Sequence, residues 1–139
     1  MPAASSALPE SVLDASAIVE ALLGTDIGVV VRERIRGRKL HAPAHLDAEV
    51  LSALGRLHRA AELPADAVAA MLEDLADAPI RRHPLAPLLT GAWNRRAELR
   101  LVDAIYVELA SALGRLPLIS TDGRLARASA LVDLITVPA

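Results

Sequence analysis

The sequence predicts an α/β fold: a three-layer α/β/α sandwich around a central, mostly parallel sheet of about five short strands. Three observations support this prediction. Short strand-like runs alternate along the chain with longer segments of helical periodicity, as in parallel sheets covered on both faces. The length of 139 residues fits a single domain with its own core. Apolar residues make up 53% of the chain and charged residues 23%, which is a globular composition.

The individual elements follow from apolar spacing. Five short runs bounded by turn residues predict strands at 11–14, 39–42, 80–83, 117–120 and 134–137. Seven segments with apolar side chains three and four positions apart predict helices at 15–23, 26–36, 44–62, 64–79, 85–99, 102–113 and 122–130. The third strand is polar and is therefore expected at an edge of the sheet.

Residues that begin or end helices support these boundaries. Gly24, Gly37 and Gly114 stand where helices should end, because glycine readily adopts the left-handed conformation of a helix C-terminus. Asp26 is expected to cap its helix, and Pro64 suits a first helical turn. Residues 1–10 are small and polar with two prolines, and we expect a flexible leader there, followed by a single domain over 11–139.

Composition excludes several kinds of site and location. The chain has no cysteine, so disulfide bonds and thiolate metal sites are impossible, and a metal ion must bind oxygen or imidazole. The formal net charge of −2 argues against coating nucleic acid with bulk positive charge. No signal peptide and no stretch near the roughly 18 apolar residues of a membrane span is present. We therefore expect a cytoplasmic protein that does not contact a membrane.

Two aspartates stand at the ends of expected strands. Asp14 follows the first strand and Asp122 follows the fourth. Ligands of open parallel sheets bind beyond the carboxyl ends of the strands. Either residue alone could be only a helix N-cap. Two carboxylates in one small region repel each other. Arg124 could compensate the charge of Asp122, whereas a bound Mg²⁺ or Mn²⁺ would relieve the repulsion for both.

Periodicity leaves the other acidic residues undecided. The expected buried stripe of the 102–113 helix, with the residue before it, consists of Leu101, Ile105, Leu109 and Ala112. Asp103 projects away from the centre of this stripe, so solvent is its simplest destination. Asp47 and Glu49 flank the apolar stripe of the 44–62 helix on opposite sides, and spacing alone cannot choose between them.

Other side chains give weaker evidence for a functional site. His41 and His45 have the four-residue spacing of metal ligands, but Pro43 lies between them and breaks a shared helical face. A histidine metal site is therefore not expected. Trp93 and Tyr106 lie at helical spacing among apolar residues, which favours core positions over base-stacking platforms.

Four segments resemble the PIN domains of VapC-like toxin ribonucleases. In chain order they are Val12–Ala17, Ala42–Pro43 leading to Glu49–Val50, Leu101–Ala110, and Leu118–Leu125. The resemblance implies that the family's acidic quartet corresponds to Asp14, Glu49, Asp103 and Asp122, with Glu49 preferred over Asp47. It also implies that the strands bearing Asp14 and Asp122 are neighbours. Ser16 and Thr121 match positions whose hydroxyl groups often support the acidic site, and Arg96 matches an arginine ahead of the third segment.

The same resemblance implies an activity and partners. We expect a metal-dependent endoribonuclease that hydrolyses RNA, often transfer RNA, with Mg²⁺ or Mn²⁺ at the quartet as metal ligands and catalytic groups. Such a protein is the toxin of a toxin–antitoxin pair. A homodimer and a cognate antitoxin are implied partners, and an apolar groove between the second and fourth helices is the expected place for the antitoxin.

Three other functions fit the sequence less well than a metal-dependent ribonuclease. A catalytically silent PIN-like module would bind without cleaving, but the intact quartet argues against it. A receiver-type signalling domain requires paired acids after the first strand and a late lysine, whereas Ala15 follows Asp14 and Lys39 is the only lysine. A phosphatase of the haloacid dehalogenase type requires an Asp-x-Asp motif, and position 16 is serine.

Overall fold

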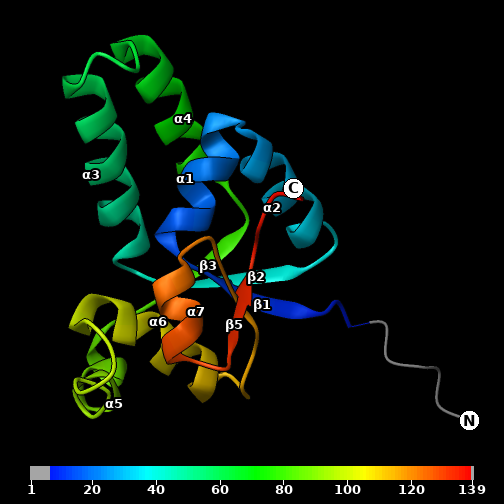
Figure 1. Cartoon of the computed structure of the whole chain (residues 1–139), viewed down its shortest axis with the longest axis vertical. Coiled ribbons are helices and arrows are strands. Elements are labelled where there is room, and N and C mark those ends of the chain that lie inside the picture. The colour runs from blue at the N-terminus through cyan, green and yellow to red at the C-terminus, as the bar shows by residue number, and fades with distance from the viewer. Residues whose placement is uncertain (1–6, 139) are drawn as a thin grey trace, which may run out of the picture.

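The computed structural model describes residues 7–138, and within them the strands form one five-stranded parallel sheet (Figure 1). The strands are β1 (Glu10–Leu13), β2 (Lys39–Pro43), β3 (Ile80–His83), β4 (Leu118–Ser120) and β5 (Val132–Leu134). Their order is β3-β2-β1-β4-β5, with every neighbouring pair parallel. This confirms the predicted parallel sheet, the pairing of β1 with β4 and the edge position of β3.

Helices cover both faces of the sheet. They are α1 (Ala15–Leu23), α2 (Asp26–Ile35), α3 (Leu46–Arg59), α4 (Ala65–Asp77), the 3₁₀ turn η1 (Ala86–Leu88), α5 (Leu89–Trp93), α6 (Leu101–Ala112) and α7 (Gly123–Ala128). Figure 1 shows α1 to α4 above the sheet and α5 and α6 below it. Helix α1 packs against α2 and α3, whereas α6 crosses β1, β2 and β4. The three-layer prediction is therefore confirmed.

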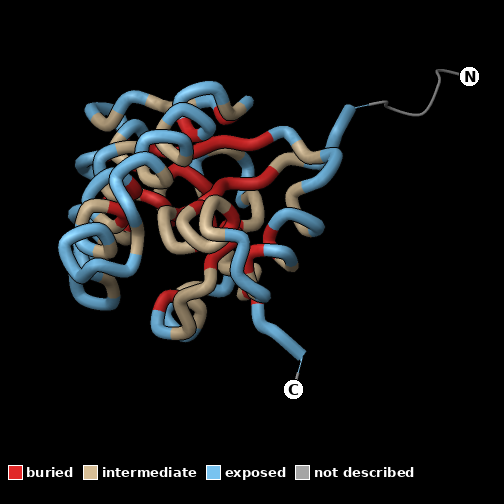
Figure 2. The backbone as a smooth tube through the Cα atoms, turned by 90° about the horizontal axis from the view of Figure 1, so that it is seen from above, coloured by how far each residue is buried: buried red, intermediate tan, exposed pale blue. Residues whose placement is uncertain are grey.

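The core lies on the central strands and on the helix surfaces that face them, where Figure 2 shows the buried backbone. Its side chains are aliphatic apart from Tyr106, which is 2% exposed. Buried aliphatic side chains stabilise a fold roughly in proportion to the area they remove from water. A core of this kind leaves the carboxyl ends of β1 and β4 free to present polar side chains.

Local chemistry explains where α1 and α2 begin and end. Asp14 caps α1 by accepting from the backbone N–H of Ala17, and Gly24 ends it with a φ of 69°. The cap of α2 is Thr25, whose hydroxyl oxygen accepts from the N–H of Gly28, and Asp26 is the first helical residue. The predicted cap at Asp26 was therefore wrong by one position, although its carboxylate still lies in the favourable first turn.

Several predicted boundaries need correction. No single helix spans 85–99; the structure has η1, the short α5 and then turns over 94–98, because backbone hydrogen bonds shift to three-residue spacing both before α5 and directly after it. The last strand is 132–134 rather than 134–137, since β4 pairs with it from Val132. The first strand begins at Glu10, where the carbonyl of Pro9 accepts from Lys39. Residues 1–6 of the predicted leader lie outside the described residues.

The buried surface of α6 also differs from the prediction. Leu101 is 46% exposed, and the buried residues of this helix are Ala104, Tyr106, Val107, Leu109 and Ala110. The prediction that Tyr106 lies in the core is confirmed, whereas Trp93 is 55% exposed and the prediction for it was wrong. Within residues 7–138, every helix is too short or too polar to cross a bilayer.

Candidate active site

An acidic pocket of about 270 Å³ opens at the carboxyl ends of β1 and β4. All four residues of the predicted quartet line it, and they come from the ends of β1 and β4 and from the first turns of α3 and α6. The walls also include Glu20 on α1, Arg56 on α3 and Arg100 immediately before α6. Residues distant in the chain therefore form one negatively charged hollow at the place where α/β proteins bind ligands.

Asp14 is the most deeply placed acid, with 6% of its surface exposed. Its Oδ2 accepts from the Ser120 hydroxyl at 2.5 Å, and its Oδ1 accepts from the Ser16 hydroxyl at 2.7 Å and from the Ala17 N–H at 3.0 Å. Burial raises the pKa of Asp14, the three hydrogen bonds lower it, and repulsion from Asp122 adds to the rise. A cation in the pocket would favour the ionised form.

Glu49 is held by a tyrosine and a histidine. The Tyr106 hydroxyl donates to Glu49 Oε1 at 2.6 Å, and His45 Nε2 lies 3.3 Å from the same oxygen. Burial, followed by the hydrogen bond to Glu49, raises the pKa of Tyr106, so this phenol keeps its proton and remains a donor. Asp14 and Glu49 both accept from neutral hydroxyl groups, and we name them the hydroxyl-held pair.

Asp47 points elsewhere. Its carboxylate pairs with the Arg82 guanidinium at 3.1 Å and lines a different hollow between α3 and α4. The structure thus places Glu49 in the acidic pocket and Asp47 outside it.

The other two acids of the quartet face arginines. Arg100 Nε donates to Asp103 Oδ2 at 3.0 Å, and Arg124 Nε lies 3.9 Å from Asp122 Oδ1. Both arginine side chains are more than 70% exposed. Asp103 and Asp122 are named the arginine-held pair. Asp103 therefore does not project freely into solvent as its expected position on the helix suggested.

The aspartates at the strand ends act as helix caps and also line the pocket. Asp122 Oδ1 accepts from the backbone N–H of Arg124 at 2.9 Å, as Asp14 does from Ala17. Ser120 joins the two, because its hydroxyl donates to Asp14 and its oxygen accepts from the Asp122 N–H at 3.0 Å. The two explanations for these aspartates are therefore compatible.

The predicted supporting residues have different positions. Ser16 contacts Asp14 directly, whereas Thr121 lines the pocket and donates its backbone N–H to Ser16 Oγ at 3.1 Å. Arg96 is not among the pocket residues; its guanidinium lies 4.7 Å from the centre of the Trp93 ring. Sequence reasoning missed Ser120 and Arg100, although a serine in the fourth strand and an arginine three positions before Asp103 are visible signals.

His41 and His45 do not meet. His41 Nδ1 lies 2.8 Å from His83 Nε2, and His41 Nε2 lies 2.7 Å from Glu10 Oε1. His83 is therefore part of a polar network, and desolvation, followed by the charge of His41, lowers the pKa of His83. Nowhere between residues 7 and 138 do three or more His, Asp or Glu side chains converge closely enough to bind one ion directly.

The chain matches the PIN domain family over residues 11–131. It is 54% identical to the ribonuclease VapC3 of Mycobacterium tuberculosis over 130 residues, covering 92% of this chain and 94% of that protein. It is 40% identical to the ribonuclease VapC12 of the same organism, covering 84% and 89%. The crystal structure of PAE2754 from Pyrobaculum aerophilum superposes with a TM-score of 0.65 at 25% identity, covering 89% and 82%. This chain therefore belongs to the PIN-domain family, in its VapC branch.

Proposed function

We propose that this chain is an endoribonuclease of the VapC type, the toxin of a toxin–antitoxin pair, which hydrolyses RNA with a divalent cation at its acidic pocket. The main supporting observation is the convergence of Asp14, Glu49, Asp103 and Asp122 on one hollow at the carboxyl ends of β1 and β4. The similarity to ribonucleases VapC3 and VapC12 supports the same activity.

The donor set fits Mg²⁺ or Mn²⁺. Every candidate ligand is a carboxylate oxygen, and hard divalent cations prefer such donors. The side chains do not converge directly on one point. Mg²⁺ commonly binds through one or two carboxylates and keeps several water ligands, so a pocket of this width suits it. Asp14 and the residues of the arginine-held pair would hold the cation partly through its water ligands, and Glu49 lines the same pocket.

The chain's own residues supply position and charge. Ser16 and Ser120 fix both oxygens of Asp14, and Tyr106 fixes one oxygen of Glu49. A bound divalent cation would neutralise charge on the scissile phosphate and make a water ligand more acidic. Glu49 lies where a carboxylate could accept the proton of an attacking water, since only its Oε1 is engaged by Tyr106 and His45.

Cleavage of total RNA by the purified, partner-free protein tests the activity. We expect cleavage with Mg²⁺ or Mn²⁺, none with EDTA, and losses of at least about a hundredfold in Asp14→Asn and Asp103→Asn. The matched pair Glu49→Gln and Asp47→Asn separates two acids on one helix: the first should lose activity and the second should keep it. Cleavage that persists in EDTA or in both aspartate variants would refute the metal mechanism.

A silent binding module is the alternative, and calorimetry combined with the cleavage assay separates it from an enzyme. Titration of Mn²⁺ into the wild-type protein should give heat that Asp122→Asn reduces. Heat with no RNA cleavage would favour the silent module. No heat at all would refute the metal site, both for the enzyme and for the silent module.

The antitoxin is proposed to bind along α1, α2 and α4. A hollow of about 300 Å³ lies there, lined by residues that include Ile18, Leu22, Ile35 and Ala78, with Arg32 and Asp74 beside them. This lies close to the groove expected from the sequence, with α1 also contributing. Leu22→Arg should weaken binding of the cognate antitoxin without reducing RNA cleavage; undiminished binding would mean that the partner binds elsewhere.

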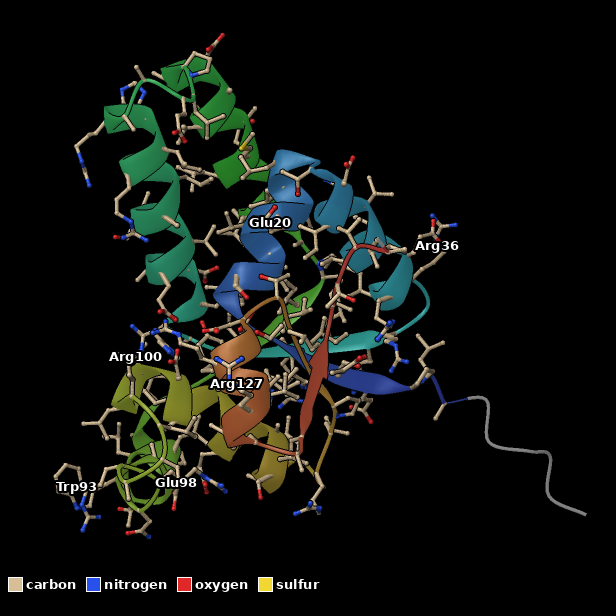
Figure 3. The ribbon with its side chains drawn as sticks, in the orientation of Figure 1. Glu20, Arg36, Trp93, Glu98, Arg100 and Arg127 are labelled. Atoms are coloured by element: carbon tan, nitrogen blue, oxygen red, sulfur yellow. The ribbon has the colours of Figure 1, made fainter. Side chains whose placement is uncertain are left out.

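Homodimerisation is proposed through the face that carries α5 and the start of α6. Leu89, Trp93, Leu101 and Val102 are each about half exposed and border a shared apolar hollow. Figure 3 shows Trp93 projecting outward at this end of the molecule. Exposed apolar patches of this kind mark association sites. Leu101→Glu should turn a dimer into a monomer in sedimentation analysis, whereas a wild-type monomer would refute the proposal.

Location and substrate follow from the same proposal. We propose that the protein acts in the cytoplasm, where it would meet both RNA and its antitoxin, and transfer RNA is the first substrate to test. Sequencing of the 5′ ends produced by cleavage identifies which RNA is cut.

A further inference from the structure

Arg100 stands between two hollows. With Asp103 and Asp122 it lines both the acidic pocket and a second hollow of about 150 Å³. The far wall of the second hollow comes from α7 and includes Arg124, and Glu98 lines it from the loop before α6. The two hollows therefore adjoin each other at Arg100, Asp103 and Asp122.

Packing does not hold the Arg100 side chain in place. Its side chain is 71% exposed, whereas that of its partner Asp103 is 20% exposed. An exposed ion pair between residues three apart contributes little to stability. The guanidinium can therefore leave Asp103 with little loss to the fold.

Several acids stabilise the charged form of Arg100. The hydrogen bond to Asp103 raises the pKa of Arg100, and the charges of Asp103, Asp122 and Glu49 act in the same direction. These are residues of the acidic pocket. A cation bound there would compete with the guanidinium for the same negative charge.

We propose that Arg100 is an exchangeable counter-ion: it neutralises Asp103 in the metal-free protein, and it binds a phosphate of the RNA when a divalent cation takes Asp103. This inference rests on the proposed function. Guanidinium groups suit phosphate because they donate two parallel hydrogen bonds. The released side chain lies at the rim, where an RNA backbone is the nearest new anion.

The charge balance of the second hollow supports the exchange. Its charged residues are Glu98, Arg100, Asp103, Asp122 and Arg124. Without a cation the three carboxylates outnumber the two guanidinium groups. When a bound cation neutralises Asp103 and Asp122, the remaining charges are those of two arginines and one glutamate. The hollow then changes from net negative to net positive. It should then attract phosphate rather than repel it.

Arg100→Gln tests this inference, with Arg36→Gln as a matched control. Arg36 also pairs with an acid three residues away, Glu33, at 3.0 Å and is 75% exposed. Figure 3 shows Arg36 and Arg100 on opposite sides of the molecule. Calorimetric titration with Mn²⁺ measures metal affinity without RNA. Steady-state cleavage of a single-stranded oligonucleotide that the wild-type protein cuts measures KM and kcat.

Arg100→Gln should strengthen the binding of Mn²⁺ and weaken the binding of RNA. Arg100→Gln should bind Mn²⁺ about three to ten times more tightly, because a competing positive charge is gone. The same variant should raise KM about fivefold to tenfold with little change in kcat, because a phosphate contact is lost. Arg100→Lys should keep the metal affinity of the wild type and raise KM less. Arg36→Gln should change neither quantity.

Other outcomes are decisive as well. Unchanged Mn²⁺ affinity in Arg100→Gln would overturn the exchange, and an unchanged KM would overturn the phosphate contact. Equal effects in Arg36→Gln would assign both changes to general charge. A wild-type protein that neither binds Mn²⁺ nor cuts RNA would refute the proposed function itself, which is a different result from an active enzyme that is indifferent to Arg100.

Discussion

The hydroxyl-held pair and the arginine-held pair of the acidic pocket differ in where their partners come from. The hydroxyl donors Ser120 and Tyr106 lie 106 and 57 residues from the acids that they contact and are buried, and Ser16, two residues from Asp14, adds one local hydrogen bond. The arginines lie two or three residues from theirs and are exposed. Tertiary packing therefore orients the first pair, whereas the second pair has local counter-ions that solvent already surrounds.

This difference separates positioning from exchange. A neutral hydroxyl can keep its hydrogen bond when a cation arrives, because it adds no repulsive charge. An arginine must move away or share its carboxylate, because like charges repel strongly at short range. Substitutions in the hydroxyl-held pair's partners should therefore affect stability and geometry, and those in the arginine-held pair's partners should affect affinity for ions.

Ser120→Ala should have the largest effect on stability. It removes the donor to Asp14 Oδ2 and the acceptor of the Asp122 N–H from a fully buried position. Loss of a buried hydrogen bond to a charged group costs about 2 kcal/mol, and we expect that decrease in the free energy of unfolding. Urea denaturation measures it. The control is Ser52→Ala, whose hydroxyl is exposed and contacts only Arg56 among the described residues. Equal stabilities of the two variants would contradict tertiary positioning of Asp14.

Tyr106→Phe should have a smaller effect on stability but a clear effect on rate. It keeps the buried ring and removes only the hydroxyl that orients Glu49. We expect about 1 kcal/mol less stability and a kcat lowered about tenfold, with KM nearly unchanged. The shape of the pH profile should not change, because the raised pKa of Tyr106 keeps the phenol protonated at working pH. A change in KM alone would mean that Tyr106 acts on substrate binding and does not position Glu49.

Sequence reasoning could find the strand-end acids because their position depends on the fold class. Asp14 and Asp122 follow apolar strands, and parallel strands present their carboxyl ends at one edge. The β1–β4 pairing then brings the two together. The same logic predicted the sheet and the helices on both its faces, because apolar periodicity reports which side chains are buried.

The rest of the site depends on contacts that periodicity does not encode. Asp103 was predicted to face solvent because the buried stripe was expected to begin at Leu101. Helix α6 instead buries Ala104, Tyr106 and Val107, and both Asp103 and Tyr106 line the pocket. The choice of Glu49 over Asp47 came from resemblance. In the structure it corresponds to two partners distant in the chain, Tyr106 for Glu49 and Arg82 for Asp47. Such partners are known only once the helices are packed.

Arg124→Gln should have the smallest effect and therefore tests the arginine-held pair most sharply. Asp122 keeps its helix-capping bond in this variant, because the backbone N–H of residue 124 donates it. The pair itself is long, at 3.9 Å, and Arg124 is 72% exposed, so stability should fall by less than about 0.5 kcal/mol. Urea denaturation beside Ser120→Ala measures the contrast. A loss above about 1 kcal/mol would mean that Arg124 belongs to the packed structure, and the separation between positioned and exchangeable acids would then fail at Asp122.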